Sequence, residues 1–132
     1  MAKGRVGLGR RGETLAAKVL EKRGFTIVAQ NWYCREGEVD LVARRAGELY
    51  FVEVRTRRTT TYGSPEESIT PRKRARMETV ARRYLSEHVR DGDVAWHLSS
   101  AAVVMDRAGR LQRITVYPDL DDEPWEADLN TF

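Results

Sequence analysis

The sequence has one cysteine, two histidines and no long apolar run, and each of these scarcities excludes a class of protein. Cys34 has no second cysteine with which to form an internal disulfide, and no histidine stands at metal-ligand spacing from it. No apolar stretch approaches the length of a membrane span, and the first residues lack the apolar segment of a signal peptide. We therefore expect a cytoplasmic protein that does not associate with membranes.

The charges are distributed unevenly along the chain of 132 residues, which has the length of one domain. From Arg55 to Arg83 there are nine Lys or Arg residues against three acids, although the net charge of the whole chain is only +3. From Pro118 onward there are six acids and no base. The sequence therefore predicts a basic body, residues 1–117, and an acidic tail, residues 118–132, that is either disordered or folded back on the body. A basic body favours an anionic partner, of which nucleic acid is the commonest.

A β-hairpin is predicted over residues 37–58, and the rest of the chain is organised around it. Apolar residues alternate along residues 39–43, and a second run over residues 49–54 is rich in aromatic and β-branched residues. Both runs are mostly apolar on both faces, which is typical of strands inside a covered sheet.

Two carboxylates, Asp40 and Glu53, interrupt the apolar pattern of this hairpin. If Ala46 and Gly47 form a two-residue turn, Asp40 lies opposite Glu53, with Cβ atoms roughly 4.5–5.5 Å apart. Arg55 then points to the same face. Two acids and a cation converging on one point could hold a divalent metal beside a phosphate. The alternatives are a structural Glu53–Arg55 ion pair and a three-residue turn that slips the register and separates the acids.

The hairpin resembles a known family in its longer motifs. Gly-Glu-Val-Asp-Leu-Val-Ala, Phe-Val-Glu-Val-Arg-Thr-Arg and Gly-Ser-Pro-Glu-Glu-Ser-Ile-Thr-Pro-Arg-Lys resemble the YraN-like bacterial family over roughly residues 4–117. That family is similar to Holliday-junction resolvases and to the wider PD-(D/E)XK restriction-endonuclease-like nucleases. One position departs from the nuclease pattern, because Arg55 stands where the motif has lysine. Lys73 is the only lysine between Lys22 and the end of the chain, and it is a candidate substitute for the lysine of the motif.

The resemblance implies a metal site and its ligands. Asp40, Glu53 and the carbonyl of Val54 would bind Mg²⁺ or Mn²⁺, and Glu13, on the first helix, would reach the same ion. Asp40, Glu53, Arg55 and Glu13 would then be the catalytic set. The alternative for Glu13 is an acid in the first turn of the helix that interacts favourably with the helix dipole.

The other predicted elements complete an α/β fold. We expect a helix over residues 10–23 after a flexible basic arm, a strand over 25–33, a helix from Thr70–Pro71 to about His88, and strands over 95–105 and 111–117. The glycines at positions 7, 9 and 12 do not form a dinucleotide site, because no strand precedes them. The order αβββαββ is that of a restriction-endonuclease-like sandwich, in which helices flank a mixed central sheet.

Basic residues in two segments are candidates for binding nucleic acid. Arg57 and Arg58 belong to a predicted polar loop over residues 56–63, which could contact phosphates or be an ordinary exposed loop. A second group crowds the first turns of the second long helix, where cations are unfavourable unless an anionic ligand is bound: Arg72, Lys73, Arg74 and Arg76.

The leading hypothesis from the sequence is a metal-dependent, endonuclease-like protein that acts on nucleic acid, DNA foremost and branched DNA in particular. The alternative is a nucleic-acid-binding or assembly module that retains the nuclease fold without catalysis, and Arg55 favours it because an arginine could neutralise the acids without a metal. The oligomeric state is left open between a monomer and a homodimer.

Overall fold

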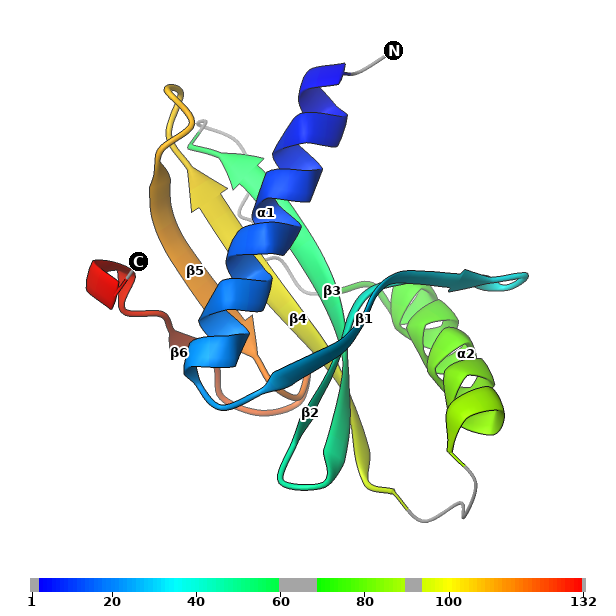
Figure 1. The fold of residues 1–132 in the computed structure, drawn as a ribbon. Helices are drawn as coiled ribbons and strands as arrows, with labels where there is room; N and C mark the ends of the chain where they lie inside the picture. The colour runs from blue at the N-terminus through cyan, green and yellow to red at the C-terminus, as the bar shows by residue number, and fades with distance from the viewer. Residues whose placement is uncertain (1–2, 60–68, 90–93, 132) are drawn as a thin grey trace.

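A computed structural model describes residues 3–59, 69–89 and 94–131 of the chain (Figure 1). Helices lie on both sides of one twisted sheet, and the C-terminal residues return to its far edge. In chain order, the described elements are α1 (Lys3–Lys22), β1 (Thr26–Cys34), β2 (Gly37–Arg45), β3 (Glu48–Arg58), α2 (Pro71–His88), β4 (Trp96–Met105), β5 (Leu111–Tyr117), β6 (Trp125–Glu126) and the 3-10 helix η1 (Leu129–Thr131).

The sheet is mixed, as the sequence predicts. Its strands lie in the order β1-β2-β3-β4-β5-β6. β3 and β4 are parallel, and every other described neighbouring pair is antiparallel. A parallel pair needs a crossover connection, and α2 lies in the segment that connects β3 to β4. The predicted order αβββαββ is therefore confirmed, with β6 and η1 as additions.

The turn between β2 and β3 has two residues, as predicted. Arg45 pairs with Glu48 and Leu41 pairs with Val52, so paired residues have numbers that sum to 93. Ala46 has φ 51° and Gly47 has φ 78°, and positive φ at both central residues is the requirement of a tight hairpin turn whose twist matches the strands. The register predicted from a two-residue turn is thus the observed one for the paired residues Leu41–Arg45 and Glu48–Val52.

The central strands are covered on both faces, which explains their apolar composition. On one face, Leu41 and Val52 pack against Leu20 of α1, and all three side chains are at most 1% exposed. On the other face, Phe51 packs with Val80 of α2. Burial of this kind contributes about 1.5–3 kcal/mol for each large apolar side chain. Alternation along β3 therefore places Glu53, like Phe51, on the α2 face.

Two predicted boundaries are wrong. Residues 3–9, expected to belong to a flexible arm before Arg10, are helical, since α1 begins at Lys3; the three glycines at positions 4, 7 and 9 cost only about 1 kcal/mol each in a helix, too little to end it. The predicted loop over residues 56–63 begins too early, because β3 continues to Arg58 by pairing with Met105 of β4, a strand distant in sequence. Residues 60–63 of that loop lie outside the described part of the chain.

The acidic tail folds back on the body instead of being disordered. Trp125 pairs with Val116 of β5 and packs against the core under α1, and the guanidinium of Arg23 lies 3.9 Å from its ring centroid. At the start of the tail, Asp119 contacts Nδ1 of His97 at 2.9 Å. The tail therefore contributes the last strand of the same sheet.

Gly12 marks the closest approach of α1 to the sheet. A Cβ atom at this position would lie 1.9 Å from Oγ1 of Thr56 and 3.1 Å from its Cβ, so rotation of the threonine alone cannot relieve the contact. A Cβ at Gly9 would meet no atom within 4 Å.

We expect Gly12→Ala to destabilise the fold by roughly 1–3 kcal/mol, because the extra methyl group pushes α1 away from β3. The matched change Gly9→Ala should stabilise it by up to about 1 kcal/mol through helix propensity. Urea unfolding of both variants measures the difference. Equal free energies of unfolding for the two variants would contradict the close packing of Gly12 on Thr56.

Candidate functional site

A cleft lies between the N-terminal turns of α2 and the ends of the paired parts of β2 and β3. Its volume is about 220 Å³. It contains both carboxylates that interrupt the hairpin pattern and the lysine singled out in the sequence. The residues that line it are Gly37, Glu38, Asp40, Glu53, Lys73, Arg76 and Met77.

Lys73 is in direct contact with the second carboxylate. Its Nζ lies 2.7 Å from Oε2 of Glu53, and the two side chains are 43% and 17% exposed. A largely buried carboxylate needs a counter-ion or hydrogen-bond donors, and Lys73 supplies the charge. The backbone of Lys73 is held in the first turn of α2, because its N–H donates to Oγ1 of Thr70, the residue that caps the helix.

Asp40 lies just beyond the last paired residues of β2 and β3. The ladder ends at Leu41 and Val52, and the backbone N–H of Val54 donates to Oδ2 of Asp40 at 2.7 Å. Burial, and after it the negative charge of Glu53, raise the pKa of Asp40 from 3.8 to about 7, although the hydrogen bond from Val54 opposes the shift. Near neutral pH, Asp40 is therefore poised between its protonated and ionised forms.

Glu13 approaches the same region from α1, on the other side of the sheet. Burial raises the pKa of Glu13, the charges of Glu38 and Glu53 act in the same direction, and a hydrogen bond from the side chain of Asn31 opposes them. The charge of Glu13 is also among the causes that raise the pKa of Asp40. Glu13 is thus electrostatically coupled to both carboxylates of the cleft.

The cleft offers the carboxylates of Asp40 and Glu53 as ligands for a divalent cation. Among residues 3–59, 69–89 and 94–131, no group of three or more His, Cys, Asp or Glu side chains lies close enough together to hold a metal ion. Mg²⁺, however, is commonly bound by one or two carboxylates, with water and substrate phosphate completing its octahedral shell. Asp40 and Glu53 provide such a pair of hard oxygen donors, so the residues of the cleft fit the ion.

Arg55, the predicted cation of the motif, follows Glu53 by two residues on β3 and is partly buried. Strand alternation directs both side chains to the same face of the sheet. A Glu53–Arg55 ion pair is not required to neutralise Glu53, because Lys73 already contacts it. A lysine from helix α2 is thus in direct contact with Glu53.

The basic residues predicted to bind nucleic acid fall into two places. Arg72 and Arg76 are exposed on α2, and Arg76 lines the cleft. Arg57 and Arg58 are exposed near the end of β3, and Arg58 lies about 16 Å farther along the strand than Glu53 at 3.3 Å per residue. Only the α2 group therefore borders the cleft.

Arg74 is engaged by the acidic tail. Its Nη1 lies 2.9 Å from Oδ1 of Asp121, and Nη2 contacts the other oxygen of the same carboxylate. Paired N–H donors on one carboxylate are the favoured geometry of arginine. Both groups are exposed, so a phosphate could replace Asp121 at modest cost.

Asn31 is a site residue that sequence reasoning missed. It lies on β1 with φ 50°, a left-handed conformation that asparagine tolerates better than most residues, and its side chain reaches Glu13. An asparagine within a predicted strand is a weak hint of such irregularity.

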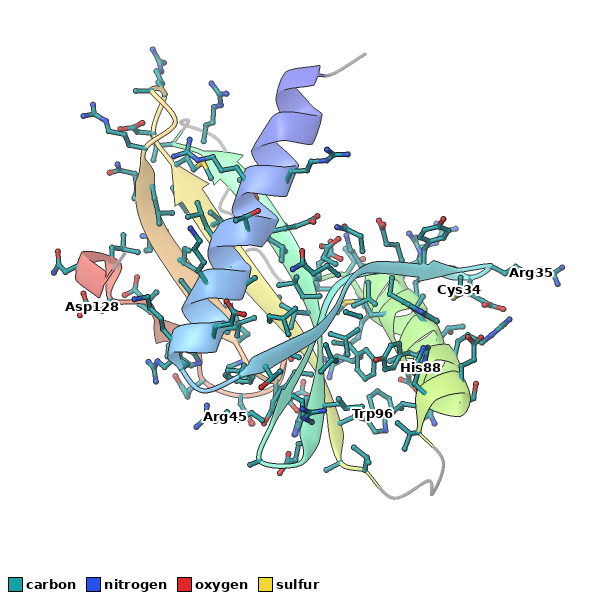
Figure 2. All side chains as sticks on the ribbon, in the orientation of Figure 1. Cys34, Arg35, Arg45, His88, Trp96 and Asp128 are labelled. Atoms are coloured by element: carbon teal, nitrogen blue, oxygen red, sulfur yellow. The ribbon has the colours of Figure 1, made fainter. Side chains whose placement is uncertain are left out.

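Figure 2 shows the hairpin of β1 and β2 extending past α2, with Cys34 and Arg35 at its far end.

No helix in the described part of the chain combines the length and apolar character needed to cross a membrane.

Comparison with known proteins identifies relatives that cover most of the chain. The model of "Uncharacterised protein family UPF0102" matches residues 12–115, a span that includes Glu13 and the whole cleft. A UPF0102 protein of Pelotomaculum thermopropionicum is 45% identical over 86% of this chain and 94% of its own length. One from Roseiflexus castenholzii is 44% identical over 75% of this chain and 80% of its own length. The chain belongs to the UPF0102 family, the YraN-like family that its motifs resemble.

Proposed function

We propose that this protein is a metal-dependent, endonuclease-like protein that acts on DNA, with branched DNA as its preferred substrate. The observation that carries the proposal is the convergence of Asp40, Glu53 and Lys73 in one cleft beside an exposed basic helix turn. Two acids and a lysine are the chemical groups of the PD-(D/E)XK pattern that the sequence resembles. A cytoplasmic location belongs to the same proposal, since that is where bacterial DNA lies.

In this proposal, Asp40 and Glu53 would hold Mg²⁺ or Mn²⁺ together with the carbonyl of Val54, and Glu13 of α1, which does not line the cleft, would act through its charge. A bound ion would supply Lewis-acid chemistry, by activating water and polarising the phosphodiester. Lys73 and Arg55 offset negative charge on the phosphate, and neither the permanently charged Arg55 nor a charged Lys73 removes a proton from water. Arg72 and Arg76 position the nucleic-acid backbone.

The second candidate is a nucleic-acid-binding or assembly module that retains the fold without catalysis. The contact between Glu53 and Lys73 favours it, because an internal counter-ion satisfies Glu53 without any metal. The raised pKa of Asp40 also lets this residue shed its charge by protonation. The two candidates therefore differ in whether a divalent ion enters the cleft.

We expect Mn²⁺ to raise the melting temperature of the wild type by mass action, and Asp40→Asn to abolish the rise, because an amide is a poor ligand for a hard cation. The measurement is thermal melting at pH 8 across a Mn²⁺ titration. Asp106→Asn, in the turn after β4, is the control for a carboxylate outside the cleft and should leave the Mn²⁺ effect unchanged.

Metal-dependent cleavage separates the two candidates further. Wild type incubated with a four-way junction and a linear duplex in Mn²⁺ should cut the junction faster if the protein is a nuclease. A Mn²⁺-induced rise in melting temperature that persists in Asp40→Asn would remove the proposed metal site. Binding of junction DNA without any cleavage would favour the non-catalytic module.

A further inference from the structure

The contact between Lys73 and Glu53 affects how tightly the cleft binds a cation; this inference rests on the proposed metal site. The ammonium lies 2.7 Å from Oε2 of Glu53, on one of the two carboxylates available for a metal. A divalent ion bound there would stand near the ammonium, and two cations close together repel. In the absence of nucleic acid, Lys73 and a metal therefore compete for Glu53.

Lys73 is able to leave this contact. Its side chain is 43% exposed, whereas Glu53 is 17% exposed, so the lysine is the partner with access to solvent. A lysine carries its charge on a flexible four-carbon stem and can turn toward another anion without movement of the helix. Its position in the first turn of α2 is unfavourable to the helix dipole, which favours an anionic partner for the side chain.

A nucleic-acid phosphate would provide that other anion. Arg76 lines the same cleft and Arg72 is exposed on the same helix, so a phosphate attracted to this turn arrives within reach of Lys73. The backbone amides at the start of α2 favour an anion at the same place. Transfer of the ammonium from Glu53 to the phosphate frees Glu53 for the cation, and the phosphate adds an oxygen ligand.

We propose that Lys73 couples metal uptake to nucleic-acid binding: it neutralises Glu53 while the cleft is free of nucleic acid and moves to the phosphate when nucleic acid binds. Metal affinity is then low in the free protein and high in the complex. Because coupling is reciprocal, the metal also tightens nucleic-acid binding by the same factor. Such a device restricts metal loading, and hence any phosphodiester chemistry, to the DNA-bound state.

The test measures Mn²⁺ affinity by electron paramagnetic resonance of free Mn²⁺, at fixed low salt, with and without a short DNA duplex. DNA without protein is titrated in parallel to correct for the Mn²⁺ that it binds. The variants are Lys73→Met, which keeps the apolar stem, Lys73→Arg, which keeps the charge, and Arg107→Met, which removes an exposed charge in the turn after β4, away from the cleft. Lys73→Gln is a second neutral variant that still donates a hydrogen bond to Glu53 should Lys73→Met fail to fold.

For the protein without DNA, Lys73→Met should bind Mn²⁺ about tenfold more tightly than wild type, within the usual range of coupling between sites. DNA should tighten Mn²⁺ binding in the wild type and in Arg107→Met, and should do so about tenfold less in Lys73→Met. Lys73→Arg should resemble the wild type in its weak metal binding without DNA.

Each other outcome overturns a specific statement. Equal or weaker Mn²⁺ binding by Lys73→Met without DNA overturns the coupling role of Lys73 and leaves the metal site in place. Absence of Mn²⁺ binding by wild type and Lys73→Met, with or without DNA, overturns the proposed metal-dependent function and the coupling with it.

Discussion

Asp40→Asn should stabilise the protein at pH 8 and should do so much less at pH 5. Burial and the charge of Glu53 raise the pKa of Asp40 to about 7 in the folded state, from 3.8. Ionising this residue therefore costs folding free energy, and the cost grows as pH rises from about 4 to about 7. Asparagine removes the charge, and its side-chain oxygen can still accept the hydrogen bond from Val54.

The expected gain at pH 8 is at most about 4 kcal/mol, the equivalent of a shift of three pKa units. Urea unfolding at pH 5 and pH 8, without divalent ions, measures it. Asp106 provides a control of opposite sign, because the backbone N–H of Arg110 lowers the pKa of Asp106. The cost of Asp106→Asn should be larger at pH 8 than at low pH. A lower free energy of unfolding for Asp40→Asn than for the wild type at pH 8 would show that the ionised carboxylate stabilises the fold.

Replacing Arg72, Lys73 and Arg74 together by alanine should weaken DNA binding for all sequences alike. Phosphate contacts release counterions, so each lost contact reduces the slope of log affinity against log salt by about 0.9. We expect the triple variant to lower the slope by about 2–3. Fluorescence anisotropy with labelled duplexes of unrelated sequence, over a range of salt concentrations, measures both quantities.

Breaking the ion pair between Arg74 and Asp121 should have the opposite effect on DNA affinity. Asp121→Asn should tighten DNA binding, because it releases a guanidinium that the tail otherwise neutralises. Arg107→Ala, an exposed arginine in the turn after β4, should leave the salt slope nearly unchanged. Salt-independent binding by the wild type, or an equal effect of Arg107→Ala, would contradict a role for the α2 turn.

The hairpin was predictable because its information is local. The alternation of apolar residues and the Ala46–Gly47 dipeptide indicated the two-residue turn, with a three-residue turn as the alternative, and the two-residue register is the observed one. The course of β3 beyond Val54 was not predictable, because pairing with β4 extends it to Arg58 and that partner lies more than forty residues away. Local propensity reports on neighbours in sequence, whereas strand length depends on the partner strand.

The contact between Lys73 and Glu53 depends on how α2 lies against the sheet. The sequence identified Lys73 only as an isolated lysine in a chain rich in arginine. The helical spacing of Val80 and Tyr84 predicted which side of α2 is buried, and both pack over the hairpin. The position of α2 along the strands comes from packing with residues of several strands, and this position decides that Lys73 reaches Glu53.

The parallel pairing of β3 with β4 has a consequence for biosynthesis. A ribosome releases α1, β1, β2 and β3 well before residues 96–105, so the nascent hairpin exposes an unpaired, largely apolar strand edge at what becomes the centre of the sheet. Such edges are prone to pair with other chains, and pairing between distant segments is slow to form. During synthesis, Glu53 also has no contact with Lys73 until α2 has been released from the ribosome. Assembly of the cleft is thus a late event in folding, and the period of greatest aggregation risk ends when β4 is inserted beside β3.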